Sequence, residues 1–202
     1  MIEQTLLRHG ISRIVGVDEA GRGACAGPLV VAAVMLKDPL SSTWEGIRDS
    51  KELTPLQREE QFSIIVSGAI EYSIIEISAD DIDSLGLHRA NLEGMRRAVL
   101  SIAGEIDYVL TDGYAVSGLS IPNLAVVKGD QVALSISAAS ILAKVHRDRL
   151  MVELDGKYPG YGLADHKGYV TKIHQAAMEK LGVSEIHRRS YANVAAIINS
   201  QN

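Results

Sequence analysis

The sequence lacks the signatures of several common protein classes. Its 202 residues include a single cysteine, Cys25, which excludes an internal disulfide, and an Ala-Cys-Ala setting favours a packed thiol over a nucleophile. No segment reaches the roughly 18 uninterrupted apolar residues that a membrane helix needs. The first residues lack a basic region followed by an apolar run. We therefore expect a cytoplasmic protein with no membrane contact.

A basic surplus is also missing, because the formal net charge is -5. This argues against a protein that simply coats nucleic acid, since such binding depends on excess Lys and Arg. The charge is unevenly distributed, however. Residues 1–115 carry 10 basic and 18 acidic side chains, whereas residues 116–202 carry 10 and 7. An acidic half that could hold cations is followed by a basic half that could meet phosphates.

Length and hydrophobic content, 202 residues and 47%, predict one compact domain with an appendage. The Tyr158-Pro159-Gly160-Tyr161-Gly162 stretch breaks the chain and is the best candidate boundary. We expect a main domain over residues 1–160 and a C-terminal helical extension over residues 161–202, packed on it.

The most informative stretch is Gly16-Val17-Asp18-Glu19-Ala20-Gly21-Arg22-Gly23, in which an apolar strand ends in two carboxylates and a glycine turn. By itself it could be a solvated strand end. It also matches the loose dinucleotide pattern G-x-G-x-x-A, but Gly27-Pro28 and a second apolar run, 29–36, follow where a helix should open. In a regular strand Asp18 and Glu19 would point to opposite faces, and only a strand end or a glycine-assisted distortion lets both serve one site.

The remaining pattern predicts an α/β fold. The runs 14–19, 29–36 and 69–77 predict a three-stranded antiparallel ribbon. Thr54 as N-cap and Pro55 at the first helical position predict a helix with an apolar stripe of Leu56, Phe62, Ile65 and Val66. Further helices are predicted over 87–103, stopped by Gly104, over 135–154 with a charged end at Lys144, Arg147 and Asp148, over 171–181, and from 187 onward.

Two more carboxylates follow short apolar strands and lie beside glycine: Asp112 before Gly113, and Asp130 after Gly129. Strand-end side chains of one sheet can converge on one rim. With no Cys or His at ligand spacing, an all-oxygen set suits Mg²⁺ or Mn²⁺, and such ions imply phosphates. The P-loop pattern G-x-x-x-x-G-K-[ST] is absent. Asp80, Asp81 and Asp83 are better explained as a solvated helix start.

Together, these residues resemble type 2 ribonuclease H (ribonuclease HII). The resemblance covers residues 16 to about 191 and is carried by ordered motifs: the 16–23 stretch, Asp49-Ser50-Lys51, Asp112-Gly113, Lys128-Gly129-Asp130, 137–145 with Arg147-Asp148, and Tyr161-Gly162 with His166-Lys167-Gly168-Tyr169. It implies a ribonuclease-H-like mixed five-stranded sheet, the antiparallel ribbon plus two parallel strands, flanked by helices.

The resemblance further implies cleavage of RNA paired with DNA, and incision 5′ of single ribonucleotides embedded in duplex DNA. Hydrolysis with two metal ions would leave 3′-OH and 5′-phosphate ends. Asp18, Glu19, Asp112 and Asp130 would be the catalytic, metal-binding carboxylates, holding Mg²⁺ or Mn²⁺. The partners implied are RNA–DNA hybrids and ribonucleotide-containing duplex DNA, and we expect a monomer.

The resemblance assigns the remaining site residues to the substrate. Gly21, Arg22 and Gly23 would contact the ribose 2′-OH, and Tyr169 would pack on the next sugar. Phosphate contact or support of the site is implied for Ser50, Lys51, Lys128 and Lys144, although Lys144 and Asp148 are also spaced for a surface pair. Where many relatives carry Asn and Thr, this chain has Gly86 and Asn91, so DNA-strand contacts there are an open question.

Two alternatives remain at this level. Another metal-dependent nuclease of the same fold, a resolvase or an exonuclease, would share the carboxylates but not the Gly-Arg-Gly loop and Tyr169. A catalytically silent nucleic-acid-binding module has no reason to place four acids against a phosphate backbone.

Overall fold

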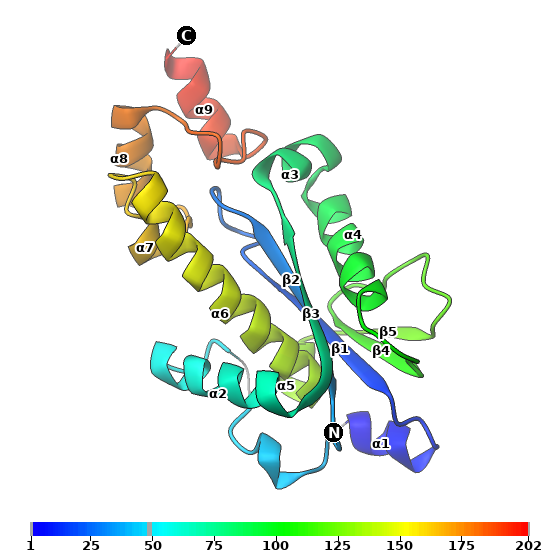
Figure 1. Cartoon of the computed structure of the whole chain (residues 1–202). Helices are drawn as coiled ribbons and strands as arrows, with labels where there is room; N and C mark the ends of the chain where they lie inside the picture. Colours follow the sequence, from blue (N-terminus) through cyan, green and yellow to red (C-terminus); the bar gives the residue numbers. More distant parts are fainter. Residues whose placement is uncertain (1, 48–49, 202) are drawn as a thin grey trace.

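The structure is a computed structural model that describes residues 2–47 and 50–201 (Figure 1). Asp49 of the Asp-Ser-Lys motif lies outside the described residues. The elements are α1 (Ile2–Arg8), β1 (Ile14–Ala20), β2 (Leu29–Leu36), the 3-10 helix η1 (Ser42–Trp44), α2 (Pro55–Gly68), β3 (Ala69–Ile77), α3 (Ala79–Leu85), α4 (Leu87–Leu100), β4 (Tyr108–Asp112), β5 (Asn123–Val126), α5 (Gly129–Val132), α6 (Leu134–Lys157), α7 (Leu163–His166), α8 (Lys172–Leu181) and α9 (Ala192–Gln201).

One mixed sheet with the strand order β3-β2-β1-β4-β5 forms the centre of the molecule. The pairs β1–β2 and β2–β3 are antiparallel, and β1–β4 and β4–β5 are parallel. This confirms the predicted ribbon plus two parallel strands. Strands β2 and β3 have the predicted bounds, and β1 extends one residue further than predicted, to Ala20. Because β1 and β4 run side by side in one direction, their carboxyl ends, with Asp18 and Asp112, meet at one edge of the sheet.

Helices cover both faces of the sheet, with α6 on one side and α4 on the other (Figure 1). The apolar run of β2 alternates between them: Val31 and Ala33 pack in the α4 core, and Val30 and Ala32 in the α6 core. A strand buried on both faces has no polar side, which explains its continuous hydrophobicity. The same alternation holds in β1.

Helix α6 approaches β1 closely because position 16 has no side chain. A Cβ placed on Gly16 would lie 2.1 Å from the carbonyl carbon of Ser135. At the start of α6, Glu3 of α1 accepts hydrogen bonds from the Ser135 backbone N–H and hydroxyl, both at 2.9 Å. These contacts hold α6 against the strand that carries Asp18 and Glu19.

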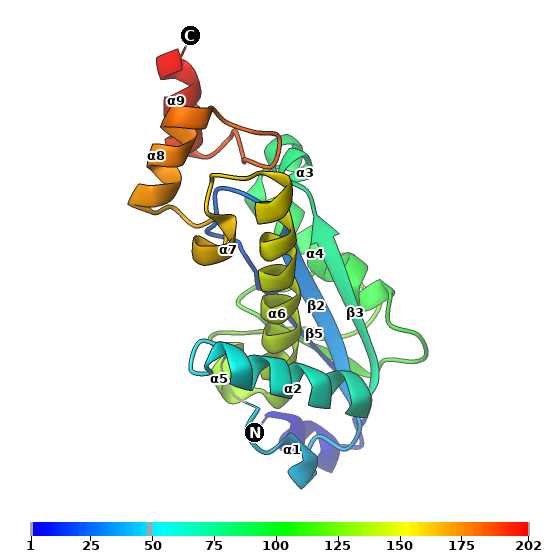
Figure 2. The ribbon, with the colours of Figure 1, turned by 60° about the vertical axis from the view of Figure 1, so that its left-hand side comes forward.

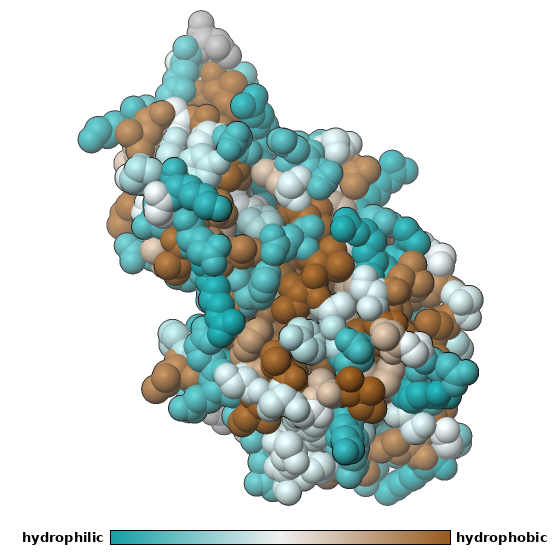
Figure 3. All heavy atoms as spheres, viewed as in Figure 1, coloured by the Kyte–Doolittle hydropathy of each residue, from teal (hydrophilic) through white to brown (hydrophobic). Residues whose placement is uncertain are grey.

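The C-terminal elements α7 to α9 lie at the far end of α6 from α2 (Figure 2). They have an apolar core of their own, in which Met178 and Val194 pack with Cys25, Ala26 and Met151 of the main part. Cys25 is fully buried, which confirms the expectation of a packed thiol. The space-filling view is indented between α2 and these elements (Figure 3).

Helix α2 begins as predicted, with Thr54 and Gln57 forming a reciprocal capping box and Pro55 at the first position. The predicted apolar stripe was wrong at its first member, because the Leu56 side chain is 71% exposed while Ile65 is fully buried. Helix α3 confirms the solvated start, since Ser78 caps it and Asp80 and Asp81 occupy its first turn.

Three other predictions need correction. Helix α4 ends at Leu100 rather than near Ala103, because the Ile102 N–H bonds to the Val99 carbonyl three residues back, a tighter turn that ends the helix before Gly104. Residues 187–191 do not start a helix: His187 bridges to Ala26, and α9 starts at Ala192. Arg147 is no charged surface end of α6, since it is fully buried.

Candidate active site

A cleft of about 350 Å³ opens over the carboxyl end of β1. It collects residues from six separated stretches of the chain, which the topology brings to one edge of the sheet. Besides Ala20 and Ser140, its lining contains ten of the predicted or considered site residues: Asp18, Glu19, Gly21, Arg22, Gly23, Ser50, Lys51, Asp112, Lys144 and Tyr169. Lys128 and Asp130 are not in this lining.

Asp18 and Glu19 lie on opposite faces of β1, as strand alternation requires, yet both border the cleft. Asp18 faces α6, where Ser140 bonds to it, and Glu19 faces α4, where Asn91 lies beside it. No strand distortion is needed, because the cleft opens across the strand end. Ser140 is an addition to the predicted set. Its place in the Ser137–Val145 motif, one helical turn before Lys144, was the available signal.

Burial is the main reason why both acids bind protons tightly. Desolvation raises the pKa of Asp18 well above its ordinary value, and the charges of Glu19 and Asp112 raise it further. Desolvation also raises the pKa of Glu19, to about 7, although Arg22 opposes the shift. Carboxylates crowded in this way favour a counter-cation.

Asp112 and Asp130 are linked through one short turn. The Gly129 N–H donates to Asp112 Oδ1 at 2.7 Å, and the Lys51 ammonium donates to Asp130 Oδ2 at 2.7 Å. Asp130 is only 4% exposed. The sequence predicted a strand-end position for Asp130, and this prediction was wrong. Strand β5 ends at Val126, and Asp130 lies in the first turn of α5, where the helix dipole favours a negative charge.

Two buried arginines hold the Gly-Arg-Gly loop and the residues that follow it through hydrogen bonds to backbone carbonyls. Arg147 donates to the carbonyls of Pro28, Ala26 and Lys167, and Arg188 donates to those of Gly27 and Arg22. Gly21 has a φ of +91°, and a Cβ there would lie 1.9 Å from Arg147 Nε. The glycine is therefore required both by backbone conformation and by space.

Both arginines donate to backbone carbonyls rather than to carboxylates, Arg188 also to the Tyr191 hydroxyl, and desolvation lowers the pKa of Arg147 to about 10. Neither role was visible in the sequence, because an arginine next to Asp148 or in a His-Arg-Arg run has the pattern of a surface charge. Tyr114 was also missed: Arg22 lies over its ring, 4.6 Å from the centroid, and donates to its hydroxyl.

The other predicted substrate residues have mixed positions. Tyr169 is 40% exposed and lies near Gly23, whose added Cβ would be 3.7 Å from the tyrosine ring. Ser50 is buried and its hydroxyl bonds to that of Ser140 at 2.8 Å. Lys144 pairs with Asp148 at 2.7 Å, which confirms the predicted i, i+4 pair. Lys128 is exposed in a left-handed turn before α5.

The donor set fits a divalent cation. Glu19 Oε2 is buried without a hydrogen-bond partner, so this oxygen has a free lone pair next to the crowded Asp18 and Asp112. Carboxylate oxygens are the ligands that hard cations prefer. In the part of the chain that the structure describes, however, no three acidic, histidine or cysteine side chains are already close enough to surround one ion.

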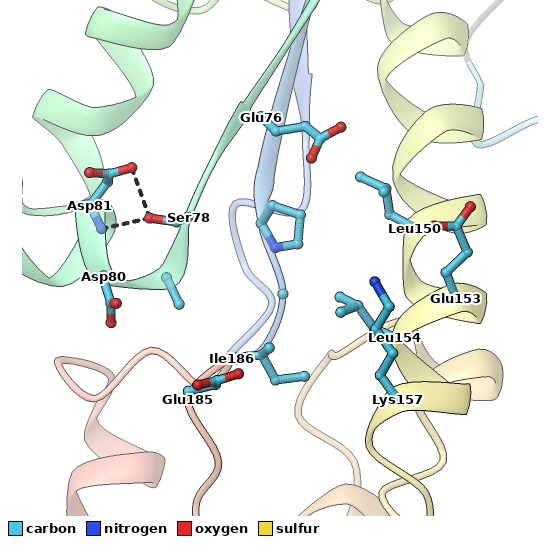
Figure 4. Close-up of a pocket in the computed structure, with 13 residues that line it drawn as sticks. Glu76, Ser78, Asp80, Asp81, Leu150, Glu153, Leu154, Lys157, Glu185 and Ile186 are labelled. Carbon is cyan, nitrogen blue, oxygen red and sulfur yellow. Dashed lines mark hydrogen bonds between the residues drawn. The ribbon is translucent and has the colours of Figure 1, made fainter.

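A second pocket, of about 470 Å³, lies away from these carboxylates (Figure 4). It is formed by the end of β3, the start of α3, the last turns of α6 and the 185–186 segment. Glu76, Asp80, Asp81, Glu153 and Glu185 border an apolar floor, with one lysine, Lys157. An acidic border repels phosphate, so this pocket is unsuited to the nucleic-acid backbone.

Comparison with known proteins decides between the sequence-level hypotheses. The family model described as Ribonuclease HII matches residues 15–194. The chain belongs to the ribonuclease HII family. A Ribonuclease HII from Salinispora arenicola is 52% identical over 196 residues, covering 97% of this chain and 73% of the relative. One from Rhodococcus opacus is 52% identical over 198 residues, covering 98% and 88%.

Solved structures agree with the family. The ribonuclease H2 of Pyrococcus horikoshii is similar with a TM-score of 0.81 and 27% identity, over 93% of this chain and 98% of that one. A Bst-RNase HIII in complex with Mn²⁺ has a TM-score of 0.72 at 16% identity, over 96% and 72%, and shares the fold. As a ribonuclease HII, the protein is a metal-dependent endoribonuclease that cuts the RNA strand of RNA–DNA hybrids. The resolvase and exonuclease alternatives are not supported.

None of the helices within residues 2–47 and 50–201 combines the length and the apolar character needed to cross a bilayer.

Proposed function

We propose that this enzyme incises duplex DNA 5′ of single embedded ribonucleotides as well as cutting continuous RNA–DNA hybrids, leaving 3′-OH and 5′-phosphate ends. The observation that carries the proposal is the shared cleft. The Gly-Arg-Gly loop and Tyr169, the parts suited to contact a ribose and its neighbour, line the same cleft as Asp18, Glu19 and Asp112. One ribonucleotide bound at the loop would thus place its phosphate beside the acids.

Recognition of a single ribonucleotide depends on the 2′-OH, which can both donate and accept a hydrogen bond. Gly21 and Gly23 leave backbone groups of the loop free of side chains, and the buried guanidinium groups of Arg147 and Arg188 keep the 22–28 backbone in one conformation. A rigid loop loses little entropy when it binds. We propose that Arg22 and Tyr169 complete this reader, with Tyr169 packed on the following sugar.

Asp18, Glu19, Asp112 and Asp130 would hold Mg²⁺ or Mn²⁺, two ions at a time. Such ions supply an activated water and stabilise the charge that develops on the leaving oxygen. The protein's own contribution is to keep the acids buried and to keep Lys51 in place. Lys51 pairs with Asp130, and its side chain is 77% exposed. It lines the cleft in which a phosphate would lie. Ser50 and Lys128 would support or contact further phosphates.

Three finer statements belong to the same proposal. We propose that residues 1–160 form the catalytic domain and residues 161–202 a helical extension that contributes Tyr169 to the cleft. We also propose that the enzyme acts as a monomer and in the cytoplasm. The extension packs on the main part through the apolar cluster around Cys25 and Met178.

The experiment uses an end-labelled DNA duplex with one ribonucleotide, an all-DNA duplex of the same sequence, and a continuous RNA–DNA hybrid. Each is incubated with enzyme and Mg²⁺ or Mn²⁺. We expect one cut 5′ of the ribonucleotide, cutting of the hybrid, and an intact all-DNA duplex. Equal cutting of both DNA duplexes, or cutting of the hybrid alone, would refute single-ribonucleotide incision.

Matched carboxylate-to-amide variants test the site itself. Asp112→Asn keeps the Oδ1 that accepts from Gly129 but is a poor ligand for a hard cation, so we expect a folded protein with at least about a hundredfold lower turnover. Asp80→Asn changes an exposed acid of α3 outside the cleft and should retain full activity. Equal turnover of the two folded variants would remove Asp112 from the site.

A further inference from the structure

Two buried histidines lie outside the catalytic cleft. His174 of α8 is fully buried and His187 is 1% exposed, and their Nε2 atoms are 3.1 Å apart. The His166 ring stacks on that of His174 with centroids 4.3 Å apart. Buried imidazoles need hydrogen-bond partners, so the partners at each end of the pair determine which nitrogens carry protons.

The backbone determines a single proton arrangement. The Ser184 N–H donates to His187 Nδ1 at 3.1 Å, so a neutral His187 carries its proton on Nε2. At the other end, His174 Nδ1 is 3.0 Å from the Tyr169 carbonyl oxygen, which can only accept, so His174 carries its proton on Nδ1. His174 Nε2 is then the acceptor that His187 Nε2–H requires. The four groups form one directional chain from Ser184 to the carbonyl of Tyr169.

Both imidazoles are neutral at neutral pH, as this arrangement demands. Burial lowers the pKa of His174, and burial together with the nearby His174 lowers the pKa of His187 to about 4. A second proton on either ring would place two N–H donors face to face. This chain of hydrogen bonds is therefore intact at neutral pH.

The hydrogen-bond chain ends at Tyr169, whose backbone position determines where its side chain meets the substrate. The peptide before Tyr169 is held by the Cys25 and Ala26 N–H groups, which donate to the Gly168 carbonyl at 2.9 and 3.3 Å. Gly168 has a φ of +77°, and a Cβ there would lie 2.3 Å from the Ala26 carbonyl oxygen. Contacts to the 168 carbonyl from one side and to the 169 carbonyl from the other fix the backbone that carries the Tyr169 ring.

We propose that His174 and His187 are positioning residues for substrate specificity, which hold the Tyr169 backbone so that its ring meets the sugar next to the ribonucleotide. This inference rests on the proposed function of Tyr169. The hydrogen bond from His174 Nδ1 is the part of the chain that acts on Tyr169 directly. His187 acts one step further back, by fixing the His174 tautomer.

Two variants of His174 separate positioning from packing, because both remove the ring. In His174→Asn the amide takes the place of Nδ1 and can still donate to the Tyr169 carbonyl. In His174→Gln the amide reaches the place of Nε2 and can still bond to His187, but the bond to Tyr169 is lost. Thermal unfolding is measured for both, and kcat and KM are measured on the single-ribonucleotide duplex and on the continuous hybrid.

We expect His174→Gln to raise KM for the single-ribonucleotide duplex about threefold to tenfold, with a smaller change on the hybrid and little change in kcat. We expect His174→Asn to retain the wild-type ratio between the substrates. If neither variant changes the ratio of activities on the two substrates, or if both variants change it equally, the inference is overturned. If neither variant folds, His187→Gln, which keeps the contact with His174, and His187→Asn, which loses it, give the same comparison.

Tyr169→Ala makes failure of the inference distinguishable from failure of the proposed function. If Tyr169→Ala changes the substrate ratio and His174→Gln does not, the role of Tyr169 stands and only the positioning role of the histidines is overturned. An unchanged ratio in Tyr169→Ala would overturn the proposed role of Tyr169 and the inference with it.

Discussion

The burial of His187 predicts a specific loss of stability in mild acid. In the folded protein the pKa of His187 is lowered to about 4 by burial and by His174, whereas an unfolded histidine titrates near about 6.5. Between these values the unfolded chain binds more protons than the folded one, so the free energy of unfolding falls as pH falls. A pH of 5 is about 1.5 units below the pKa of the unfolded histidine, so protonation of the unfolded state lowers the free energy of unfolding by about 2 kcal/mol.

Urea unfolding at pH 7.5 and pH 5.0 measures this loss. His187→Gln removes the titrating ring while keeping an amide that can bond to His174, so the variant should lose about 2 kcal/mol less than the wild type between the two pH values. Carboxylates that titrate in the same range are common to both proteins and cancel. His88→Gln, at an exposed position of α4, is the control and should follow the wild type. Equal pH dependence in all three proteins would refute the reasoning.

Three further changes test the fold and the site. Gly16→Ala should destabilise by about 3 kcal/mol or more in chemical unfolding, because its Cβ would meet the Ser135 backbone, whereas Gly156→Ala, in α6 with nothing within 4 Å, should stabilise by about 0.5 to 1 kcal/mol. Leu56→Gln should stay within about 0.5 kcal/mol of the wild type and Ile65→Ala should lose about 2 to 5 kcal/mol, and similar values for the two would contradict their different burial. In Asp112→Asn, calorimetric titration should show weaker Mn²⁺ binding, and unchanged binding would exclude it as a ligand.

The two buried arginines show how an acidic protein can bind nucleic acid precisely. Arg147 and Arg188 cannot contact a phosphate directly, because both are fully buried. Their guanidinium groups instead organise backbone carbonyls of the 22–28 loop and the carbonyl of Lys167. The guanidinium groups thus determine the conformation of this loop, and removing either would leave several carbonyls without donors.

Much of the fold followed from local patterns. The three ribbon strands, the start of α2 at Thr54 and Pro55, and the helices α3, α6 and α8 were predicted within a few residues, because each combines a strong period with a recognisable start. The errors occurred where tertiary contacts outweigh local pattern. Residues 187–191 were predicted to begin a helix, but His187 pairs with Ala26 and Arg188 donates to the Gly27 carbonyl, so this segment forms a bridge and a turn before α9 begins.

The sequence by itself determined which chemical groups the site contains: the paired acids at 18 and 19, the further acids at 112 and 130, and the glycines that flank Arg22. Only the tertiary structure decided how they meet. Parallel pairing of β1 with β4 brings Asp112 to Asp18, and Asp130 lies at the start of α5, paired with Lys51, rather than at a strand end. The cause is general, because spacing along the chain reports local periods, whereas the distance between residues far apart in the chain depends on how sheets and helices pack.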